Sequence, residues 1–452
     1  MAMGKRRPKQ PDLFIATAAL PEAPGHPFYR KLNALLAEAA FDRCVEDLCR
    51  PYYVEHVGRV SIPPGTYFRM LLVGYFEGLD SQRGIAWRCA DSRSLQEFLG
   101  YLPTEPTPDH SSLTNIRRRL PVVVVENVFA FVLDLAEQKG LTIGKTVGVD
   151  ATTLEANAAM KTLQRRDNGD DYKTYLRQLA AEDGLENPTD EELRRFDKKR
   201  QGKKLSNEDW VSPTDPDSKI TKMKDGTTHL AYKAEHVVDL KTELVLAAEV
   251  YPADQADSAT LTTSVATAEV NLARADSAAE IEEVAADKGY HKLETLAEFA
   301  AAECRTYIPE AEQPYQHTWT DKPPEQERAY RNNRRRVRGR RGKRLQRQRS
   351  EKVERSFAHV CETGRARRSW LRGLVEVSKR YLMQVAAHNL GIVMRWLFGV
   401  GTPRSLQGRA LALAAAVMAC TMLLRWLQHD YVHPRTLGIT NHRAGHPAPM
   451  AA

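Results

Sequence analysis

Cysteine is scarce in this chain, which has 452 residues and six Cys. No two cysteines form a CxxC pair, and the Cys and His residues show no spacing typical of a zinc site. Six scattered cysteines also make no disulfide framework at this length, so we expect reduced thiols in a cytoplasmic protein. The sequence therefore predicts neither a zinc module nor a disulfide-stabilised secreted domain.

The chain also lacks a convincing membrane span. Residues 410–424 are uncharged but number only 15, whereas a span needs roughly 20. The start loosely resembles a signal peptide, but its apolar stretch Leu13–Leu20 is short and interrupted by Thr17. We therefore expect no membrane partner. We also expect a flexible tail over 1–25, and a helical extension with a disordered end over 401–452.

Positive charge is concentrated rather than spread. The net charge is +8, and between Arg328 and Arg349 twelve of 22 positions are Lys or Arg. Such a tract favours a polyanionic partner, although a solvated face or a disordered tail has the same composition. Gly339 and Gly342 predict that part of the tract is flexible until such a partner binds.

The region 26–140 has helical patterns throughout. Leu32, Leu35 and Leu36 lie on one helical face, and Ser81 can cap a short helix. An arginine run, 117–119, ends another predicted helix. Several short capped helices with such a run are typical of a DNA-binding domain, and a helical dimerisation or scaffold domain fits the pattern equally well.

The pattern changes from helical to strand-like at Thr146. The sequence predicts strands over 146–153, 229–240, 243–250, 283–286 and 305–308, and helices over 258–273 and 293–301. A polar stretch, 156–228, interrupts this order as an insertion that is partly helical around 172–181 and 189–200. The order of elements predicts an α/β domain over 141–400, with a mixed sheet flanked by helices.

Two aspartates stand where predicted strands end. Asp150 follows the apolar run Val147-Gly148-Val149, and Asp287 follows Val284-Ala285-Ala286. Burying an unpaired carboxylate costs several kcal/mol, so such a residue needs partners or a function. Each aspartate alone is more typical of a structural cap, but two of them ending two core strands favour a functional site.

Six stretches in order then resemble one family. They are 148–158 (GVDATTLEANA), 215–239, 252–261 (PADQADSATL), 285–290 (AADKGY), 351–374 and 386–395. With the helical region 60–120, they make the chain similar to insertion-sequence transposases that have a DDE catalytic domain of the RNase H-like type. The resemblance covers roughly residues 26–397. It implies a DNA transposase with an RNase H-like fold, in which Asp150 and Asp287 are the first two acidic ligands.

The family's third acid is a helical glutamate, which the resemblance places at Glu354, with Glu351 one turn earlier as the alternative. The match around it is imperfect. Arg347 and Ser350 occupy the family's tyrosine and arginine positions, and Cys361 occupies its lysine position. Arg349 is a possible substitute for the arginine.

Three acids that converge would repel each other and need cations. All-oxygen ligands select Mg²⁺ or Mn²⁺, and two such ions can drive DNA cleavage and strand transfer. The family implies double-stranded DNA as partner, at the element's terminal inverted repeats and at the target, and a homodimer that holds two ends. The predicted DNA contacts are Lys288, Arg347, Arg349, Arg355, Arg365, Arg367 and Arg368. A nuclease of the same fold and an inactive DNA-binding descendant remain alternatives.

Overall fold

The structure is a computed structural model, which describes residues 25–54, 60–201, 205–223, 226–311, 319–320 and 322–405. The chain divides into two compact units, Met1–Pro403 and Arg404–Ala452. The predicted tail 1–25 and the predicted extension 401–452, with its apolar segment 410–424, lie almost wholly outside the described residues. The following description concerns the first unit.

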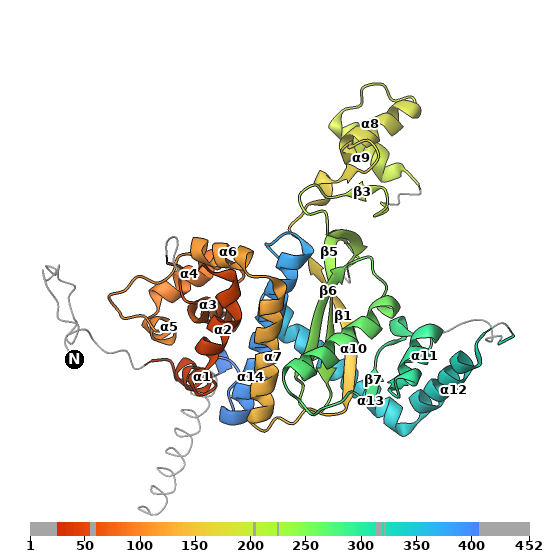
Figure 1. Ribbon diagram of the computed structural model, residues 1–452. Coiled ribbons are helices and arrows are strands. Elements are labelled where there is room, and N and C mark those ends of the chain that lie inside the picture. The colour runs from red at the N-terminus through yellow and green to blue at the C-terminus, as the bar shows by residue number, and fades with distance from the viewer. Residues whose placement is uncertain are drawn as a thin grey trace, which may run out of the picture. The chain divides into compact units, whose positions relative to one another are not determined.

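The amino-terminal part of this unit is helical (Figure 1). Leu32, Leu35 and Leu36 are buried on one face of α1, as predicted, and the Ser81 hydroxyl caps α4 by accepting from the Gly84 N–H at 3.1 Å. The longest of these helices, α7, packs against both α10 and α14 and so joins the helical region to the sheet. The helices are α1 (Pro27–Glu38), α2 (Phe41–Cys49), α3 (Pro64–Glu77), α4 (Gln82–Asp91), α5 (Arg93–Phe98), α6 (His110–Arg119) and α7 (Val122–Gln138).

A mixed sheet of six described strands forms the centre of the second part, in the order β4-β5-β1-β7-β8 with β6 also paired to β5. The first strand, β1, is central: it pairs antiparallel with β5 and parallel with β7. The α/β class and the mixed sheet are therefore confirmed. The strands are β1 (Thr146–Glu155), β4 (Lys219–Lys222), β5 (Thr228–Asp239), β6 (Val245–Pro252), β7 (Glu283–Ala285) and β8 (Arg305–Tyr307).

Helices cover both faces of the sheet, and β5 shows which helix lies on which face. Successive strand residues point to opposite faces. Glu235 accepts from Thr260 of α10, whereas the next residue, His236, contacts Ser356 of α13 and Tyr381 of α14. Thus α10 lies on one face, and α13 and α14 lie on the other. The helices of this part are α10 (Asp257–Arg274), α11 (Leu293–Ala301), α12 (Pro324–Arg338), α13 (Arg340–Phe357) and α14 (Leu374–Phe398).

The predicted insertion 156–228 contains a small folded element. Helices α8 (Tyr172–Glu182) and α9 (Asp190–Lys199) pack through Leu176, Ala180 and Leu193. A short ribbon of β2 (Gln164–Arg165) and β3 (Trp210–Val211) stands beside them. The carboxyl-terminal end of the predicted range, however, holds β4, which pairs with β5 and therefore belongs to the main sheet.

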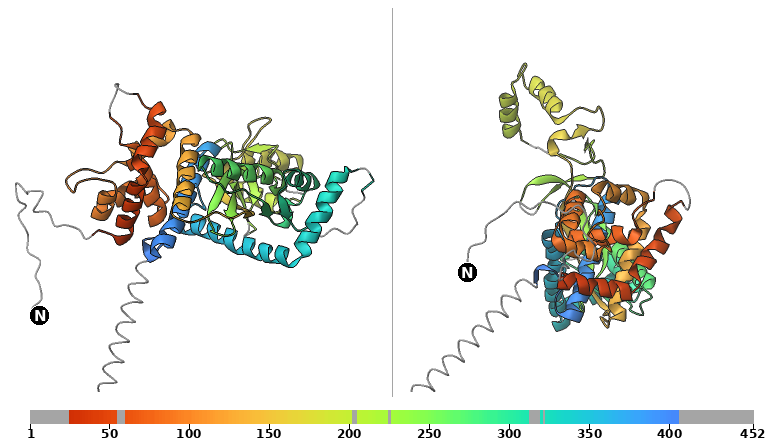
Figure 2. Two further views of the ribbon diagram at one scale, coloured as in Figure 1. Left: turned by 60° about the horizontal axis from the view of Figure 1, so that its bottom comes forward. Right: turned by 90° about the vertical axis from the view of Figure 1, so that its left-hand side faces the viewer.

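The basic tract forms two successive helices rather than a flexible segment, so the prediction based on its glycines is wrong. Gly339 is the junction, and α13 continues through Gly342, which is buried. A Cβ at Gly342 would lie 2.3 Å from the Arg336 carbonyl oxygen of α12. Glycine is used here for close approach of the two helices, which Figure 2 shows meeting at an angle.

Two buried asparagines fix helices to the outer strands of the sheet. Asn389 of α14 accepts from the Val245 N–H at 2.9 Å and donates to the Val245 carbonyl at 2.8 Å. Asn333 of α12 makes the same pair of bonds to Ile308, at 3.0 and 2.8 Å. Each amide thereby satisfies backbone groups that would otherwise be buried without partners. None of the described helices has both the length and the apolar character of a membrane span.

We predict that Asn389→Ala lowers the free energy of unfolding by about 2–4 kcal/mol, because two buried backbone groups of Val245 lose their partner. Asn168→Ala is the matched control: Asn168 is exposed in the insertion, where its amide bonds only Asp170. The control should change stability by less than about 1 kcal/mol. Urea denaturation of both variants measures the difference. Equal midpoints for the two would contradict the structural role of Asn389.

Candidate active site

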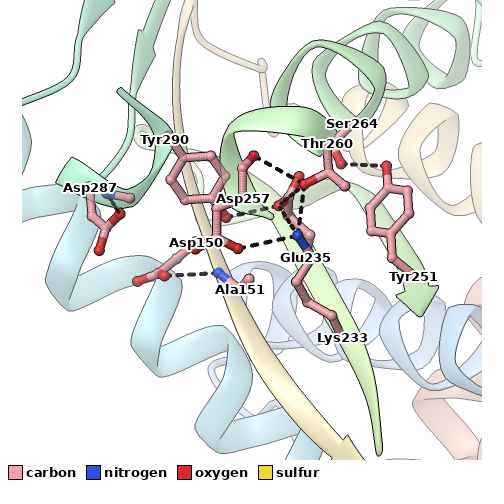
Figure 3. A network of polar contacts seen from close by, with 11 residues as sticks. Asp150, Ala151, Lys233, Glu235, Tyr251, Asp257, Thr260, Ser264, Asp287 and Tyr290 are labelled. Carbon is pink, nitrogen blue, oxygen red and sulfur yellow. Dashed lines mark hydrogen bonds and ion pairs between the residues drawn. The ribbon is translucent and has the colours of Figure 1, made fainter. Parts of the chain in front are cut away.

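The two predicted aspartates lie on neighbouring segments of the sheet, Asp150 within β1 and Asp287 two residues beyond the end of β7. Gly148 of β1 pairs with Ala285 of β7, and Asp150 and Asp287 each follow their paired residue by two positions. The parallel pairing of β1 with β7 ends at Gly148 and Ala285, so it brings the segments that carry the two acids side by side. Figure 3 shows both carboxylates in one close-up view. The structure brings these two acids near each other, since the Asp287 charge acts on Asp150. Asp150 lies in the middle of β1 and not at its end, so the strand-end prediction is wrong for this residue: the β1–β5 ladder continues past it to Glu155.

The side chain of Asp150 is 34% exposed and has a firm set of partners. One carboxylate oxygen accepts from the Ala151 backbone N–H at 2.8 Å, and the other accepts from Nη1 of Arg349 at 2.7 Å. Arg349 comes from α13, which crosses β1 beside Gly148. The local site thus consists of a carboxylate within β1, a carboxylate just beyond β7 and one cation from the basic helix.

The electrostatics of Asp150 reflect these neighbours. Burial raises the pKa of its carboxyl above the ordinary value, and the nearby Asp287 charge raises it further. The Arg349 guanidinium and the Ala151 N–H act in the opposite direction. A carboxyl that is held ionised in such a place gains from any added positive charge. The pair of aspartates is therefore a place where a cation is stabilising.

Asp287 caps a short turn, η4 (Lys288–Tyr290), by accepting from the Gly289 N–H at 2.7 Å. The end of this turn is anchored in the core, because the Tyr290 hydroxyl donates to Glu235 at 2.9 Å. Thr260 of α10 donates to the same Glu235 oxygen, also at 2.9 Å. Figure 3 shows this arrangement between β5, α10 and the turn. The position of Asp287 thus depends on a buried glutamate on another strand.

Sequence reasoning missed this supporting network. Its charged members are Lys233 and Glu235, both buried, and Asp257, which Lys233 contacts at 3.2 Å. Asp257 also lies against the site, since a Cβ on Gly289 would be 3.1 Å from one oxygen of Asp257 and from one of Asp287. The available signal was two charged residues on the same face of an otherwise apolar strand, which implies a buried polar partner on the facing helix.

Glu354 and Glu351 both lie on α13, and both are exposed. Glu351 is engaged with Arg355 in an ion pair. Glu354 has no ion pair among the described residues, although its neighbour Val353 packs on Gly148 close to Asp150. Which of the two completes the site stays a prediction, with Glu354 the less engaged.

Another buried contact fixes α13 relative to the strand that carries Asp150. His236 is the register partner of Asp150 on β5, and its Nδ1 lies 2.8 Å from the Ser356 hydroxyl. The imidazole also stacks on Phe357 at a ring distance of 4.1 Å, and its Nε2 lies 2.9 Å from the Tyr381 hydroxyl. The turn of α13 that carries Glu354 is therefore held in a fixed rotation.

The residues present fit a hard divalent cation. Asp150 and Asp287 supply carboxylate oxygens, the donor type that Mg²⁺ and Mn²⁺ select. Arg349 already places one positive charge against Asp150. Within the described ranges, no group of three or more His, Cys, Asp and Glu side chains is close enough to hold a metal ion. Asp150 and Asp287 would hold such an ion only together with a third ligand from another element.

The predicted DNA-contacting cations fall into two groups. Lys288, Arg347 and Arg365 are exposed and have no ion pair among the residues that the structure describes. The other four are engaged within the protein. Arg349 pairs with Asp150, Arg355 with Glu243, Arg367 with Glu362, and Arg368 with Glu155.

Cys361 differs in kind from the lysine that the family pattern has at its position. It is 1% exposed, and burial raises the pKa of its thiol to about 11. A neutral, buried thiol makes no contact with a phosphate. Any cation that takes this role must come from elsewhere, and the exposed Arg365 lies four positions further on.

Comparison with protein families gives two matches. Residues 18–119 match a family described as "Transposase domain (DUF772)", and residues 195–390 match "Transposase DDE domain". The second match contains Asp287 and Glu354, whereas Asp150 lies between the two matched ranges. No curated protein and no solved structure matches the chain.

The buried histidines predict loss of stability in acid. Burial lowers the pKa of His388 to about 3 and that of His236 well below its ordinary value of 6.5. The unfolded chain therefore binds protons that the folded chain does not, and stability falls as the pH drops below about 6.5. We expect His388 alone to cost on the order of 2 kcal/mol at pH 5.

Thermal unfolding at pH 7.5 and pH 5 measures this effect. His388→Gln, which leaves an uncharged polar side chain beside Tyr75, should reduce the drop in melting temperature between the two pH values. His110→Gln is the control, because His110 is partly exposed on α6. An unchanged pH dependence in His388→Gln would rule out the proposed cause.

Proposed function

We propose that this chain, which belongs to the DDE transposases of insertion sequences, binds the terminal inverted repeats of its element and cuts and joins DNA there. The catalytic acids in this proposal are Asp150, Asp287 and Glu354. The observation that carries it is the equivalent placement of Asp150 and Asp287, each two residues beyond the paired Gly148 and Ala285 of β1 and β7, beside a basic helix. Acids placed in this way can share ligands, and the helix supplies a surface for the negatively charged substrate.

The chemistry assigned to these residues is in-line displacement at phosphorus. Asp150 and Asp287 would hold Mg²⁺ or Mn²⁺ and Glu354 would complete the set. Two bound ions supply activation of a water or 3′-hydroxyl and stabilisation of the leaving oxygen. The protein contributes the fixed geometry: Ala151 N–H orients the Asp150 carboxylate, and the Glu235–Tyr290 bond holds the turn behind Asp287.

DNA would be bound by two parts of the chain. We assign 26–140 as a helical DNA-binding domain, since Arg118 and Arg119 are exposed at the end of α6. We assign 141–400 as the catalytic domain, with Lys288, Arg347 and Arg365 as its phosphate contacts. Transposition joins two element ends, so a homodimer on DNA would place one active site at each end.

Separate replacement of each acid tests the catalytic assignment. Asp150→Asn, Asp287→Asn and Glu354→Gln should each lower Mg²⁺-dependent cleavage by at least about a hundredfold, because each loses transition-state charge stabilisation. Binding to the same duplex should remain. The substrate is a duplex carrying the inverted repeats that flank the gene, and gel analysis of labelled ends measures cleavage.

Glu351→Gln is the matched control on the same helix and should cleave within a few-fold of the parent. If Glu351→Gln is inactive and Glu354→Gln is not, Glu351 is the third acid. If all the variants still cut, the site lies elsewhere. A strand-transfer assay with precut ends separates a transposase from a nuclease of the same fold, which hydrolyses but does not join.

The salt dependence of DNA binding tests the surface. Arg347→Gln should reduce the log–log slope of affinity against salt by about 0.9 if Arg347 neutralises one phosphate. Arg355→Gln should reduce it less, because Arg355 is already paired with Glu243 at 2.7 Å. Fluorescence anisotropy at several salt concentrations measures both slopes. Equal slopes in the two variants would contradict the assignment of Arg347.

A further inference from the structure

Arg349 is seated in a groove that the chain makes for it. A Cβ on Gly148 would lie 3.0 Å from Cγ of Arg349 and 3.1 Å from Cγ2 of Val353. The missing side chain therefore lets the aliphatic stem of Arg349 lie across β1, two residues before Asp150. The guanidinium then reaches the aspartate at 2.7 Å, and the arginine is only 12% exposed. Arg349 is thus directed at the acid and away from solvent.

Arg349 makes few hydrogen bonds for a buried arginine, so little holds its guanidinium in place apart from Asp150. Its Nη1 bonds Asp150, while its Nε is buried without a partner among the described residues. Arg69 shows the contrast. It is 6% exposed, and its Nε, Nη1 and Nη2 bond Asp42, Asn33 and the Phe98 carbonyl. A guanidinium that serves stability fills its donors in this way, and Arg349 does not.

Arg349 lies where the two carboxylates, Asp150 and Asp287, require a positive charge. Asp150 lies within β1, Asp287 lies two residues beyond the end of the neighbouring strand β7, and the Asp287 charge acts on Asp150. Without a cation, the two carboxylates would repel each other in a partly buried place. Arg349 supplies that charge to the protein alone, in contact with an oxygen that a divalent ion would also need.

We propose that Arg349 is a stand-in cation, which neutralises Asp150 in the DNA-free protein and competes with the divalent ion for the same carboxylate. This inference rests on the proposed function, because it takes Asp150 as a metal ligand. It assigns Arg349 a role distinct from direct DNA contact: the arginine sets how tightly the site takes up metal. Metal entry then requires Arg349 to leave Asp150.

Mn²⁺ binding to the full chain without DNA, followed by electron paramagnetic resonance, tests this role. Arg349→Gln removes the charge, and Arg349→Met removes it while keeping the stem over Gly148. Both should bind Mn²⁺ about tenfold more tightly than the parent, since a competing unit charge is gone. The rise in melting temperature on adding Mn²⁺ should also be larger in both variants.

Arg344→Gln, which removes an equal charge from an exposed position of α13, is the control and should leave Mn²⁺ affinity unchanged. Asp150→Asn reports on the metal site itself. If it weakens Mn²⁺ binding while Arg349→Gln and Arg349→Met bind no tighter than the parent, the stand-in role is wrong and the metal site stands. If Mn²⁺ binding does not depend on Asp150, the proposed metal site fails, and the role of Arg349 fails with it.

Discussion

The desolvation of a carboxylate in the middle of the central strand is the constraint around which this site is organised. Asp150 belongs to β1, which has paired strands on both sides and helices over both faces of the sheet. A charge in such a place needs partners that are themselves fixed. The backbone N–H of Ala151 and the guanidinium of Arg349 meet that need, and the second draws α13 onto β1. The ion pair between Arg349 and Asp150 thus both neutralises the aspartate and holds the basic helix α13 against β1.

Contacts on the two faces of the sheet hold two different parts of the site in place. On the α10 face, Glu235 anchors the turn behind Asp287 through Tyr290. On the α13 face, the next residue, His236, fixes the helix that carries Glu354 through Ser356. Two consecutive residues of β5 therefore hold the two sides of the site, one through a buried charge and one through a buried neutral ring. A disturbance of β5 would reach both.

Much of the fold follows from local sequence. The core strands that carry or precede the aspartates, the hairpin of β5 and β6, and helix α11 at Leu293–Ala301 are readable because burial imposes periodicity on short segments. That Asp150 lies in the middle of β1, which continues to Glu155, was not predicted. The pairing of Asp150 with Arg349 is not readable, since it depends on how α13 crosses β1 199 residues away. The same holds for Gly342, where glycine suggested flexibility but serves a close helix crossing. Both features depend on contacts between segments that are distant in the chain, and such contacts cannot be predicted from the local pattern of a single sequence.

The segment after the proposed catalytic glutamate, Ala358–Thr363, is a π-helix that continues α13. A π-helix has more residues per turn than an α-helix, so side chains beyond it are rotated relative to the spacing of 3.6. Cys361 falls within this segment and points into the core beside Tyr381. A pattern that counts seven residues forward from Glu354 along an ideal helix therefore arrives on the wrong face in this chain. Functional positions on this helix should therefore be compared by the face on which they lie, because a fixed number of residues does not lead to the same face across the π-helical segment.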